Sequence, residues 1–320
     1  MYQKHLKMNH KVLITCPPML RHIDKFTNKF EDLGIVPSTP NVIQTLTEEE
    51  LIELVPRNHG WIIGDDPATS RVFLAGKSGK LKAAVKWGIG TDNVDFEACK
   101  KNNIPITNTP GLFGEEVADL AICYLLGLAR DAFYIDREVR KGRWPKPTGI
   151  SLNGKTLGII GLGDIGKNIA KRATALNLKI IGWDPDPKNL EDYIELQTKW
   201  PSKIESCDFL IFACALTKEN HNIFSEELLN KIKSDVRIIN ISRGSLINEM
   251  ALIKGLESGK INSAALDVYE EEPFSKNHKI LKHPRCILGS HNASNTIEAV
   301  LKASNQAIDI LYKLINEAND

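Results

Sequence analysis

The sequence lacks an excess of charge and lacks any long apolar run. Its 320 residues include 41 Lys and Arg against 40 Asp and Glu, so no overall field steers the chain toward nucleic acid or an anionic membrane. The most apolar stretch, residues 120–129, is too short to cross a bilayer and is bracketed by Asp119 and Arg130. We therefore expect a core helix there, and neither nucleic acid nor a membrane as a partner.

The cysteine spacing of a metal or dithiol site is absent as well. No two cysteines form a CxxC pair, and no secretory apolar segment lies near Met1. These absences predict a reducing, cytoplasmic setting and no bound metal. The cysteines are Cys16, Cys99, Cys123, Cys207, Cys214 and Cys286.

Short apolar runs rich in β-branched residues alternate with amphipathic segments along the chain. The runs are "KVLIT" at 11, "GWIIG" at 60, "LKAAVKWG" at 81, "TLGIIG" at 156, "LKIIGWD" at 178, "DFLIFA" at 208, "VRIINIS" at 236 and "INSAALDV" at 261. Such alternation is typical of parallel sheets covered by helices on both faces. The chain is long enough for two cores, so we predict an α/β fold of two doubly wound parallel-sheet domains.

The alternation of strands and amphipathic segments stops in the middle of the chain, where one helix of about residues 115–137 is predicted. It is apolar over more of its circumference than a one-sided surface helix needs, which fits either a subunit interface or a plain core helix. Turn signals in "NTPG" and "SHNASNT" indicate two crossings between domains. We predict one domain from residues 1–108 and 293–320, ending in a helix of about 295–316, and another from residues 109–292.

The segment "TLGIIGLGDIGKNIAKRA" places three glycines between a strand and a helix. Gly161 permits a tight turn, Gly163 lets the backbone approach a pyrophosphate, and Gly166 allows the helix to pack closely on the strand. The next strand ends at Asp184, eighteen residues after Gly166, where a carboxylate would accept hydrogen bonds from an adenosine ribose. A glycine-rich turn followed by a capping aspartate is the alternative interpretation.

Asp184 also indicates which dinucleotide is bound. A carboxylate there repels a 2′-phosphate, and the "DPDP" that it begins offers no arginine to neutralise one, so NAD is predicted over NADP. Asp164 lies inside the glycine loop, where a negative charge is unfavourable for a pyrophosphate. We expect its side chain to point to solvent.

Three ionisable residues stand at or just beyond strand ends in the second half of the chain, where doubly wound sheets bind ligands. They are Arg243 after "IINIS", Glu272 in "LDVYEEEP" and His291 after "CILGS". An imidazole exchanges a proton in either direction near neutral pH, and an arginine offers a fork of donors to the carboxylate of a 2-hydroxy or 2-oxo acid. Glu272, paired with His291, would raise the pKa of His291 and fix its tautomer. Singly, the three also fit a helix C-cap, a solvated acid and a loop residue.

Several motifs, in order along nearly the whole chain, resemble those of the D-isomer-specific 2-hydroxyacid dehydrogenases, particularly the phosphoglycerate dehydrogenase-like branch. They are "KWGIGTDNVD" (86–95), "NIPITNTPG" (103–111), "GLGDIGKNIA" (161–170), "NISRGSLINE" (240–249), "ALDVYEEEP" (265–273) and "GSHNAS" (289–294). The resemblance implies a flavodoxin-like substrate-binding domain, a Rossmann-like NAD-binding domain, an active site in the cleft between them, and a homodimer built on the helix near 115–137. It also implies hydride transfer between the nicotinamide and a small D-2-hydroxy or 2-oxo acid.

By motif match, the catalytic set of the family falls on Arg243, Glu272 and His291. The resemblance also implies that backbone amides around residues 87–90 face the substrate carboxylate, and that Asp267 holds the nicotinamide carboxamide. The predicted substrate contacts are Lys86, Trp87, Gly88, Ile89, Gly90, Asn108, Arg243 and His291. The predicted NAD contacts are Gly161, Gly163, Asp164, Ile165, Gly166, Asp184, Ala213, Cys214, Ala215, Ile241, Arg243, Asp267 and His291.

A few positions depart from the pattern of the family. Asp164 stands where many relatives carry arginine, and Ser290 stands where they carry proline before the histidine. The usual histidine–proline pair near the nicotinamide is replaced by "ACALT" (213–217), so Ala213 and Cys214 would line the cofactor instead. These changes need not abolish binding. We expect no added regulatory domain after the last helix.

The segment after the "WIIG" strand bears on the substrate. Phosphoglycerate users tend to place an arginine there, whereas this chain has Gly64, Asp65 and Asp66. Lys86 and Arg71 could still supply positive charge. Phosphoglycerate therefore stays a candidate beside glycerate, hydroxypyruvate, glyoxylate and lactate.

Two other functions fit parts of the sequence. A formate or phosphite dehydrogenase would keep the fold, but relatives that use formate carry glutamine at the position of Glu272. An NAD-sensing, corepressor-like protein would need partner-binding extensions, whereas the strand and helix pattern runs compactly from about residue 11 to residue 316.

Overall fold

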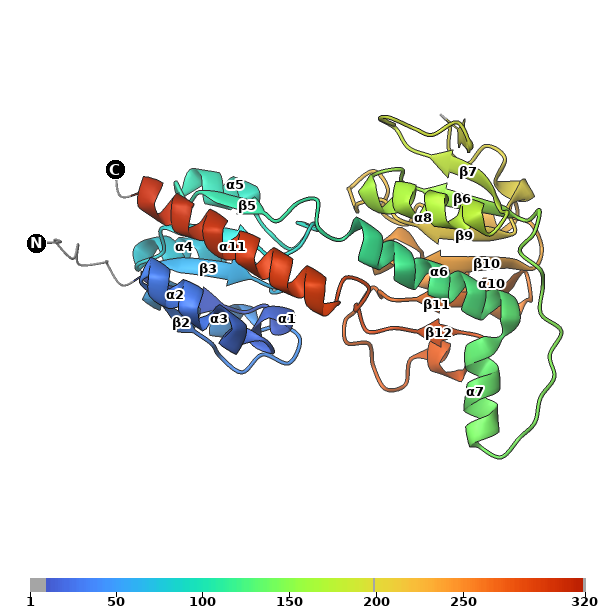
Figure 1. Ribbon diagram of the computed structural model, residues 1–320, viewed down its shortest axis with the longest axis horizontal. Helices are drawn as coiled ribbons and strands as arrows, with labels where there is room; N and C mark the ends of the chain where they lie inside the picture. The colour runs from blue at the N-terminus through green and yellow to red at the C-terminus, as the bar shows by residue number, and fades with distance from the viewer. Residues whose placement is uncertain (1–9, 198, 319–320) are drawn as a thin grey trace, which may run out of the picture. The chain divides into compact units, whose positions relative to one another are not determined.

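The chain divides into two compact units in a computed structural model that describes residues 10–197 and 199–318 (Figure 1). The first unit comprises residues 10–112 and 295–318, and the second comprises residues 113–197 and 199–294.

The sequence placed the domain boundaries after residues 108 and 292. The divisions in the structure fall after Leu112 and Ser294. The predicted segments 1–9 and 319–320 lie outside the described residues.

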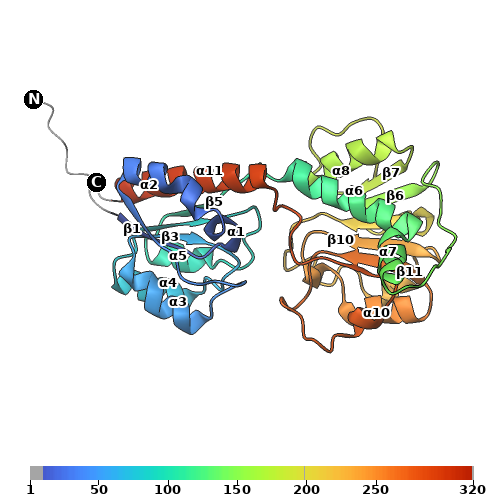
Figure 2. The ribbon, with the colours of Figure 1, turned by 60° about the horizontal axis from the view of Figure 1, so that its bottom comes forward.

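The first unit, where described, contains a parallel sheet of five strands in the order β2-β1-β3-β4-β5, which is the flavodoxin-like order. Helices cover both faces, with α2 and α11 on one face and α3 and α4 on the other (Figure 2). The strands are β1 (His10–Ile14), β2 (Ile35–Ser38), β3 (Gly60–Ile63), β4 (Ala83–Lys86) and β5 (Ile106–Asn108). The helices are α1 (Pro17–Leu20), α2 (Thr27–Leu33), α3 (Glu48–Leu54), α4 (Ser70–Ser78), α5 (Phe96–Lys101) and α11 (Ile297–Glu317).

The second unit contains, within residues 113–197 and 199–294, a parallel sheet of seven strands in the order β12-β11-β10-β9-β6-β7-β8. The helices α6 and α8 lie side by side on one face and α10 lies on the other (Figures 1 and 2). The strands are β6 (Thr156–Ile160), β7 (Lys179–Trp183), β8 (Ile194–Gln197), β9 (Phe209–Phe212), β10 (Val236–Asn240), β11 (Ile261–Leu266) and β12 (Ile287–Leu288). The helices are α6 (Gly114–Arg130), α7 (Ala132–Arg140), α8 (Asp164–Ala175), α9 (Glu226–Leu229) and α10 (Glu249–Glu257).

The predicted class, two α/β domains with parallel sheets, is confirmed. The apolar runs found in the sequence are the inner strands, and β3 and β9 are buried along their whole length. The sequence did not reveal β2 and β8, which lie at sheet edges and are partly exposed. An edge strand has one face and one side near solvent, so it lacks the continuous apolar run that marks a strand in the middle of a parallel sheet.

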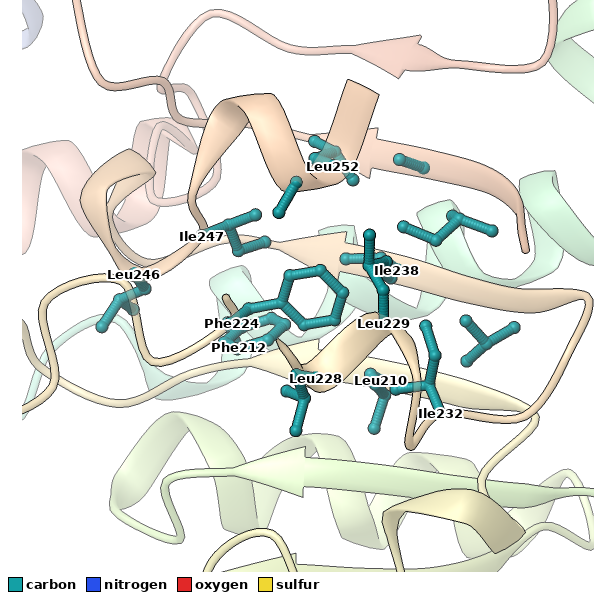
Figure 3. Packing of buried hydrophobic residues seen from close by; sticks show 14 of the residues in the cluster. Leu210, Phe212, Phe224, Leu228, Leu229, Ile232, Ile238, Leu246, Ile247 and Leu252 are labelled. Carbon is teal, nitrogen blue, oxygen red and sulfur yellow. The ribbon is translucent and has the colours of Figure 1, made fainter. Parts of the chain in front are cut away.

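The apolar core of the second unit extends to the strand ends at which the candidate polar residues lie. Phe212, the last residue of β9, packs edge-on against Phe224 with ring centroids 6.0 Å apart. Leu246 and Ile247, which follow Arg243 closely in sequence, are buried in the same cluster (Figure 3). Full burial of each such side chain stabilises the fold by about 1.5–3 kcal/mol. The backbone just after Arg243 is therefore firmly anchored.

The helix predicted at about residues 115–137 is two helices, so the prediction of one continuous helix was wrong. Helix α6 ends at Asp131, whose backbone is left-handed with φ 51° and whose N–H bonds to the carbonyl oxygen of Gly127. Helix α7 starts at the next residue, and the ring of Phe133 lies against Gly127. The apolar pattern continues through the junction and hides the break, while aspartate tolerates the left-handed conformation better than most residues.

The state of the cysteines and the length of the helices relate to the prediction of a reducing compartment and of no membrane partner. All six cysteines are described and all are unpaired. None of the helices in residues 10–197 and 199–318 combines the length and the apolarity that a membrane-spanning helix needs.

Two histidines at the start of neighbouring strands predict an acid-sensitive first unit. The rings of His10 and His59 lie 5.8 Å apart, and burial lowers the pKa of both from the ordinary value of 6.5, with Lys82 adding to the effect. A base whose pKa is lower in the folded state contributes stability above its unfolded pKa and loses it as the pH falls through the folded pKa. We expect the midpoint of urea unfolding, followed by circular dichroism, to fall between pH 7.5 and pH 5, and to fall less in His59→Gln.

Glutamine at position 59 can still accept the hydrogen bond that His59 Nδ1 receives from the N–H of Lys11. The matched control is His221→Gln, which removes an exposed histidine from the other unit. Equal pH dependence in the wild-type protein and in His59→Gln would contradict the expectation.

Candidate active site

The carboxyl edge of the seven-stranded sheet gathers the predicted residues of the second unit. The glycine loop follows β6, Asp184 follows β7, residues 213–215 follow β9, and Arg243 follows β10. Asp267 comes directly after β11, and His291 comes three residues after β12. The strand order reverses between β6 and β9, and such switch points are where doubly wound sheets bind ligands.

The glycine loop has the geometry that a dinucleotide requires. Gly161 has φ 96°, and a Cβ there would lie 2.6 Å from the backbone of Cys214, so only glycine lets β6 and β9 meet at this point. Gly163 is the N-cap of α8, is exposed, and has open space where a Cβ would be. The first turn of α8 therefore begins without a capping side chain, which leaves its N–H groups for an anion.

Asp184 ties the glycine loop to the end of β7. Its Oδ2 accepts from the N–H of Leu162 at 2.7 Å, and its Oδ1 accepts from the N–H of Asp186 at 2.9 Å. Each carboxylate oxygen has a second lone pair for a ribose hydroxyl. The residues present fit NAD.

Asp164 is exposed, as expected, and it has two neighbours. Its Oδ1 accepts from the side-chain amide of Asn168 at 3.1 Å. Its carboxylate also lies against Gly114, the first residue of α6, in space that any larger side chain at Gly114 would fill. A carboxylate at this position is favourable for the N-terminal end of α6.

The buried Asn240, the partly buried Ser242 and one glycine shape the turn that presents Arg243. Asn240, at the end of β10, donates from Nδ2 to the carbonyl oxygen of Arg243 at 2.8 Å and accepts from the N–H of Ser242 at 3.1 Å. Ser242 donates through Oγ to the carbonyl oxygen of Cys214, which joins this turn to the loop after β9. Gly244 lies so close to the backbone of Tyr269 that a Cβ would collide with it. The sequence missed Asn240 and the need for Gly244; the signal for Asn240 was a polar residue ending an apolar strand.

The side chain of Arg243 is half-buried and donates from Nη1 to the carbonyl oxygen of Ser242 at 2.8 Å. Ile241, a predicted NAD contact, is buried, and its N–H reaches the carbonyl oxygen of Phe212 at 3.4 Å. In the loop after β9, the carbonyl oxygen of Ala215 accepts from Asn220 at 2.7 Å.

Glu272 and His291 form a pair. Nδ1 of His291 lies 2.7 Å from Oε2 of Glu272, and the other carboxylate oxygen of Glu272 accepts from the N–H of Tyr269 at 2.8 Å. Because an ionised carboxylate only accepts hydrogen bonds, Nδ1 carries the proton and Nε2 faces away from the pair. About a quarter of each side chain is exposed, at 25% for His291 and 23% for Glu272.

Asp267 lies beneath the His291 turn. The residue is fully buried, and burial raises the pKa of its carboxyl group. Its Oδ2 accepts from the N–H groups of Asn292 and Ala293 at 2.9 and 2.8 Å, and its Oδ1 accepts from the hydroxyl of Tyr124 at 3.2 Å. His291 itself is left-handed with φ 54°. These bonds hold an unusual backbone conformation, a role that the sequence did not reveal for Asp267 or Tyr124.

In the first unit, the predicted substrate residues 86–90 follow the carboxyl edge of β4. Asn108 donates from its side chain to the carbonyl oxygen of Ile89 at 2.9 Å, and the N–H of Gly88 donates to the hydroxyl of Thr109 at 2.7 Å. In the part of the chain that the structure describes, the N–H groups of Ile89 and Gly90 donate to no protein acceptor. Two adjacent free amides make an anion-binding concavity.

Known proteins resemble this chain in sequence and in fold. Residues 122–293 match the family model of the D-isomer specific 2-hydroxyacid dehydrogenase, NAD binding domain. The chain is 33% identical over 276 residues to the hydroxypyruvate reductase of Thermotoga maritima, which covers 84% of this chain and 88% of that protein. It is 34% identical over 310 residues to the D-3-phosphoglycerate dehydrogenase of Methanocaldococcus jannaschii, which covers 95% of this chain and 57% of that protein. The solved glyoxylate reductase of Paecilomyes thermophila is similar with a TM-score of 0.82 and 28% identity, over 96% of both chains.

The chain therefore belongs to the D-isomer specific 2-hydroxyacid dehydrogenase family. It is an NAD-dependent oxidoreductase that acts on CH–OH donors and transfers a hydride between the nicotinamide and a small D-2-hydroxy or 2-oxo acid. The family, the activity and the cofactor predicted from the sequence are confirmed.

Proposed function

We propose that Arg243, Glu272 and His291 carry the reaction. The observation that supports this most directly is the 2.7 Å contact between Nδ1 of His291 and Oε2 of Glu272, because a proton held on Nδ1 makes Nε2 the ring nitrogen that exchanges a proton with the substrate. Bound NADH supplies the hydride that reduces C2 of a 2-oxo acid. Nε2 of His291 gives its proton to the carbonyl oxygen, so the ketone becomes a hydroxyl group, and in the opposite direction Nε2 accepts that proton.

The other residues orient the reactants. Glu272 stabilises the positive charge that His291 carries before it donates, and Arg243 binds the substrate carboxylate through two N–H donors. The free amides of Ile89 and Gly90 are the proposed substrate contacts of the first unit. The glycine loop, Asp184 and the residues after β9 are the proposed contacts of NAD.

A panel of 2-oxo acids tests this function. The panel is hydroxypyruvate, glyoxylate, pyruvate and phosphohydroxypyruvate, and the loss of NADH absorbance is followed with purified protein. The relatives are named hydroxypyruvate reductase, glyoxylate reductase and D-3-phosphoglycerate dehydrogenase, so the panel includes the 2-oxo acid of each. Tight binding of NADH without reduction of any member would contradict the proposal. Neither the site nor the comparisons favours the formate, phosphite or corepressor-like alternatives.

We propose a homodimer through α6, α7 and the segment that follows them. Leu126, Phe133 and Val139 on these helices expose 37–40% of their surface, and Trp144 exposes 77%. Large exposed apolar side chains close together in sequence are typical of a protein interface.

We also propose that the protein lies in the cytoplasm, where its six unpaired cysteines would stay reduced.

The variant Trp144→Glu is expected to be a monomer at concentrations at which the wild-type protein is a dimer, because it places a charge in the interface. Analytical ultracentrifugation measures the difference. The matched control is Ile43→Glu, which changes an 87% exposed side chain of the first unit and should leave the mass unchanged. A wild-type monomer, or a dimeric Trp144→Glu, would contradict this interface.

A further inference from the structure

Lys86 is a buried cation beside the two free amides of the first unit. It ends β4, and its residue is 3% exposed. Its Nζ lies 3.1 Å from Oδ1 of Asp65 and donates to the carbonyl oxygen of Trp87 at 2.9 Å. A Cβ placed on Gly88 would lie 3.7 Å from this Nζ, so the ammonium group lies next to the turn that contains Ile89.

The three loops that follow β3, β4 and β5 contain carboxylates and no cation. The segments that follow β3, β4 and β5, residues 64–69, 87–95 and 109–112, include no lysine and no arginine. They do include Asp65, Asp66, Asp92 and Asp95.

Arg71 and Asp66, which the sequence suggested would attract and repel a phosphate, also have partners within the first unit. Arg71, the second cation considered for a phosphate, is bound to Glu48 and lies 3.8 Å from Glu49. Asp66 is fully buried, burial raises the pKa of its carboxyl group, and its oxygens accept from the N–H groups of Leu46 and Gly64. It organises the loop, whereas Asp65 neutralises Lys86.

This arrangement suits one negative charge and opposes a second anionic group. A phosphate monoester would bring a further charge of about −1.5 to −2 among these carboxylates. To meet it, Lys86 would have to exchange Asp65 for the phosphate, and the Asp65 carboxylate would stay close by as a like charge that opposes the second anion. A carboxylate can be bound by the two amides without this exchange.

We propose that the Asp65–Lys86 pair makes the first unit select 2-oxo acids that carry one carboxylate and no phosphate. The proposal rests on the proposed function and names its substrate class. Asp65 is a specificity residue here, because it occupies Lys86, the cation that lies next to the two free amides.

The test compares hydroxypyruvate with phosphohydroxypyruvate, which differ only by the phosphate, in a phosphate-free buffer with NADH. We expect the wild-type kcat/KM for hydroxypyruvate to exceed that for phosphohydroxypyruvate by ~10²-fold or more, in the range that charge discrimination in a site provides. In Asp65→Asn, which releases Lys86, this ratio should fall about tenfold. The matched control Asp92→Asn removes one negative charge from the loop after β4 without releasing Lys86, and its ratio should stay within about twofold.

A wild-type enzyme that uses phosphohydroxypyruvate equally well or better would overturn the proposal, as would a folded Asp65→Asn with an unchanged ratio. If Asp65→Asn does not fold, the wild-type ratio decides. If no 2-oxo acid is reduced, the proposed function fails. The role of the Asp65–Lys86 pair is then tested by measuring the affinity of the protein for inorganic phosphate. That affinity must rise in Asp65→Asn and not in Asp92→Asn for the pair to act as proposed.

Discussion

Replacing His291 with asparagine is expected to lower kcat for 2-oxo acid reduction by ~10²-fold or more. Asparagine keeps a polar side chain and tolerates the left-handed backbone at this position, where φ is 54°. It has no group that gives up a proton near neutral pH, so the oxygen of the substrate must take its proton from water. The dissociation constant of NADH, measured by fluorescence titration, should change by less than about threefold, because the glycine loop and Asp184 lie on other strands.

His278 provides a matched control, because it also pairs with a glutamate. Its Nε2 lies 2.9 Å from Oε1 of Glu249, and its Nδ1 accepts from the N–H of Ile280 at 3.2 Å. Both ring nitrogens are therefore engaged within the protein, and neither can serve a substrate. His278→Asn should leave kcat within about fivefold, in the range of ordinary structural changes. Wild-type turnover in His291→Asn would show that His291 is not the proton carrier.

Replacing Arg243 with methionine is expected to lower kcat/KM for a 2-oxo acid by ~10³-fold, mostly through a higher KM, because the substrate carboxylate loses its bidentate partner. Arg243→Lys should recover about tenfold of this loss, since an ammonium group restores the charge but not the planar fork. Steady-state kinetics with hydroxypyruvate measures both effects.

The geometry of the turn indicates that substitutions at Arg243 change substrate binding without changing the fold. The backbone at Arg243 is held by Asn240 and by the buried Leu246, both of which donate to its carbonyl oxygen, a group that the substitution keeps. The melting temperature should therefore change little, and circular dichroism checks it. Arg285→Met, which removes an exposed arginine of the same unit, is the control. Equal kcat/KM in Arg243→Met and in the wild-type protein would show that Arg243 does not bind the substrate carboxylate.

Much of the site could be predicted because it lies directly after strands that the sequence marks clearly. Gly161 directly follows the run "TLGII", and Arg243 directly follows "IINIS". Since parallel strands end at one edge of their sheet, residues next in sequence to strand ends become neighbours in space.

Other parts of the site could not be predicted, because their partners are distant in the chain. That Asp267 holds the nicotinamide stays a prediction, whereas its bonds to Tyr124 and to the amides of the His291 turn were found only in the structure. The break at Asp131 was hidden because the apolar pattern crosses it without interruption. The two acids after β3 were expected simply to repel a phosphate, whereas the structure shows one buried within its loop and one paired with Lys86.

The sequence by itself determined the α/β class, the inner strands, the dinucleotide loop and the family, because each depends on residue types at short spacings along the chain. Only the tertiary structure decided how Gly244 and Asp267 hold the turns of Arg243 and His291, and that Asp65 pairs with Lys86. Those contacts join segments at the ends of different strands, and no local pattern specifies which side chains meet once the sheet has formed.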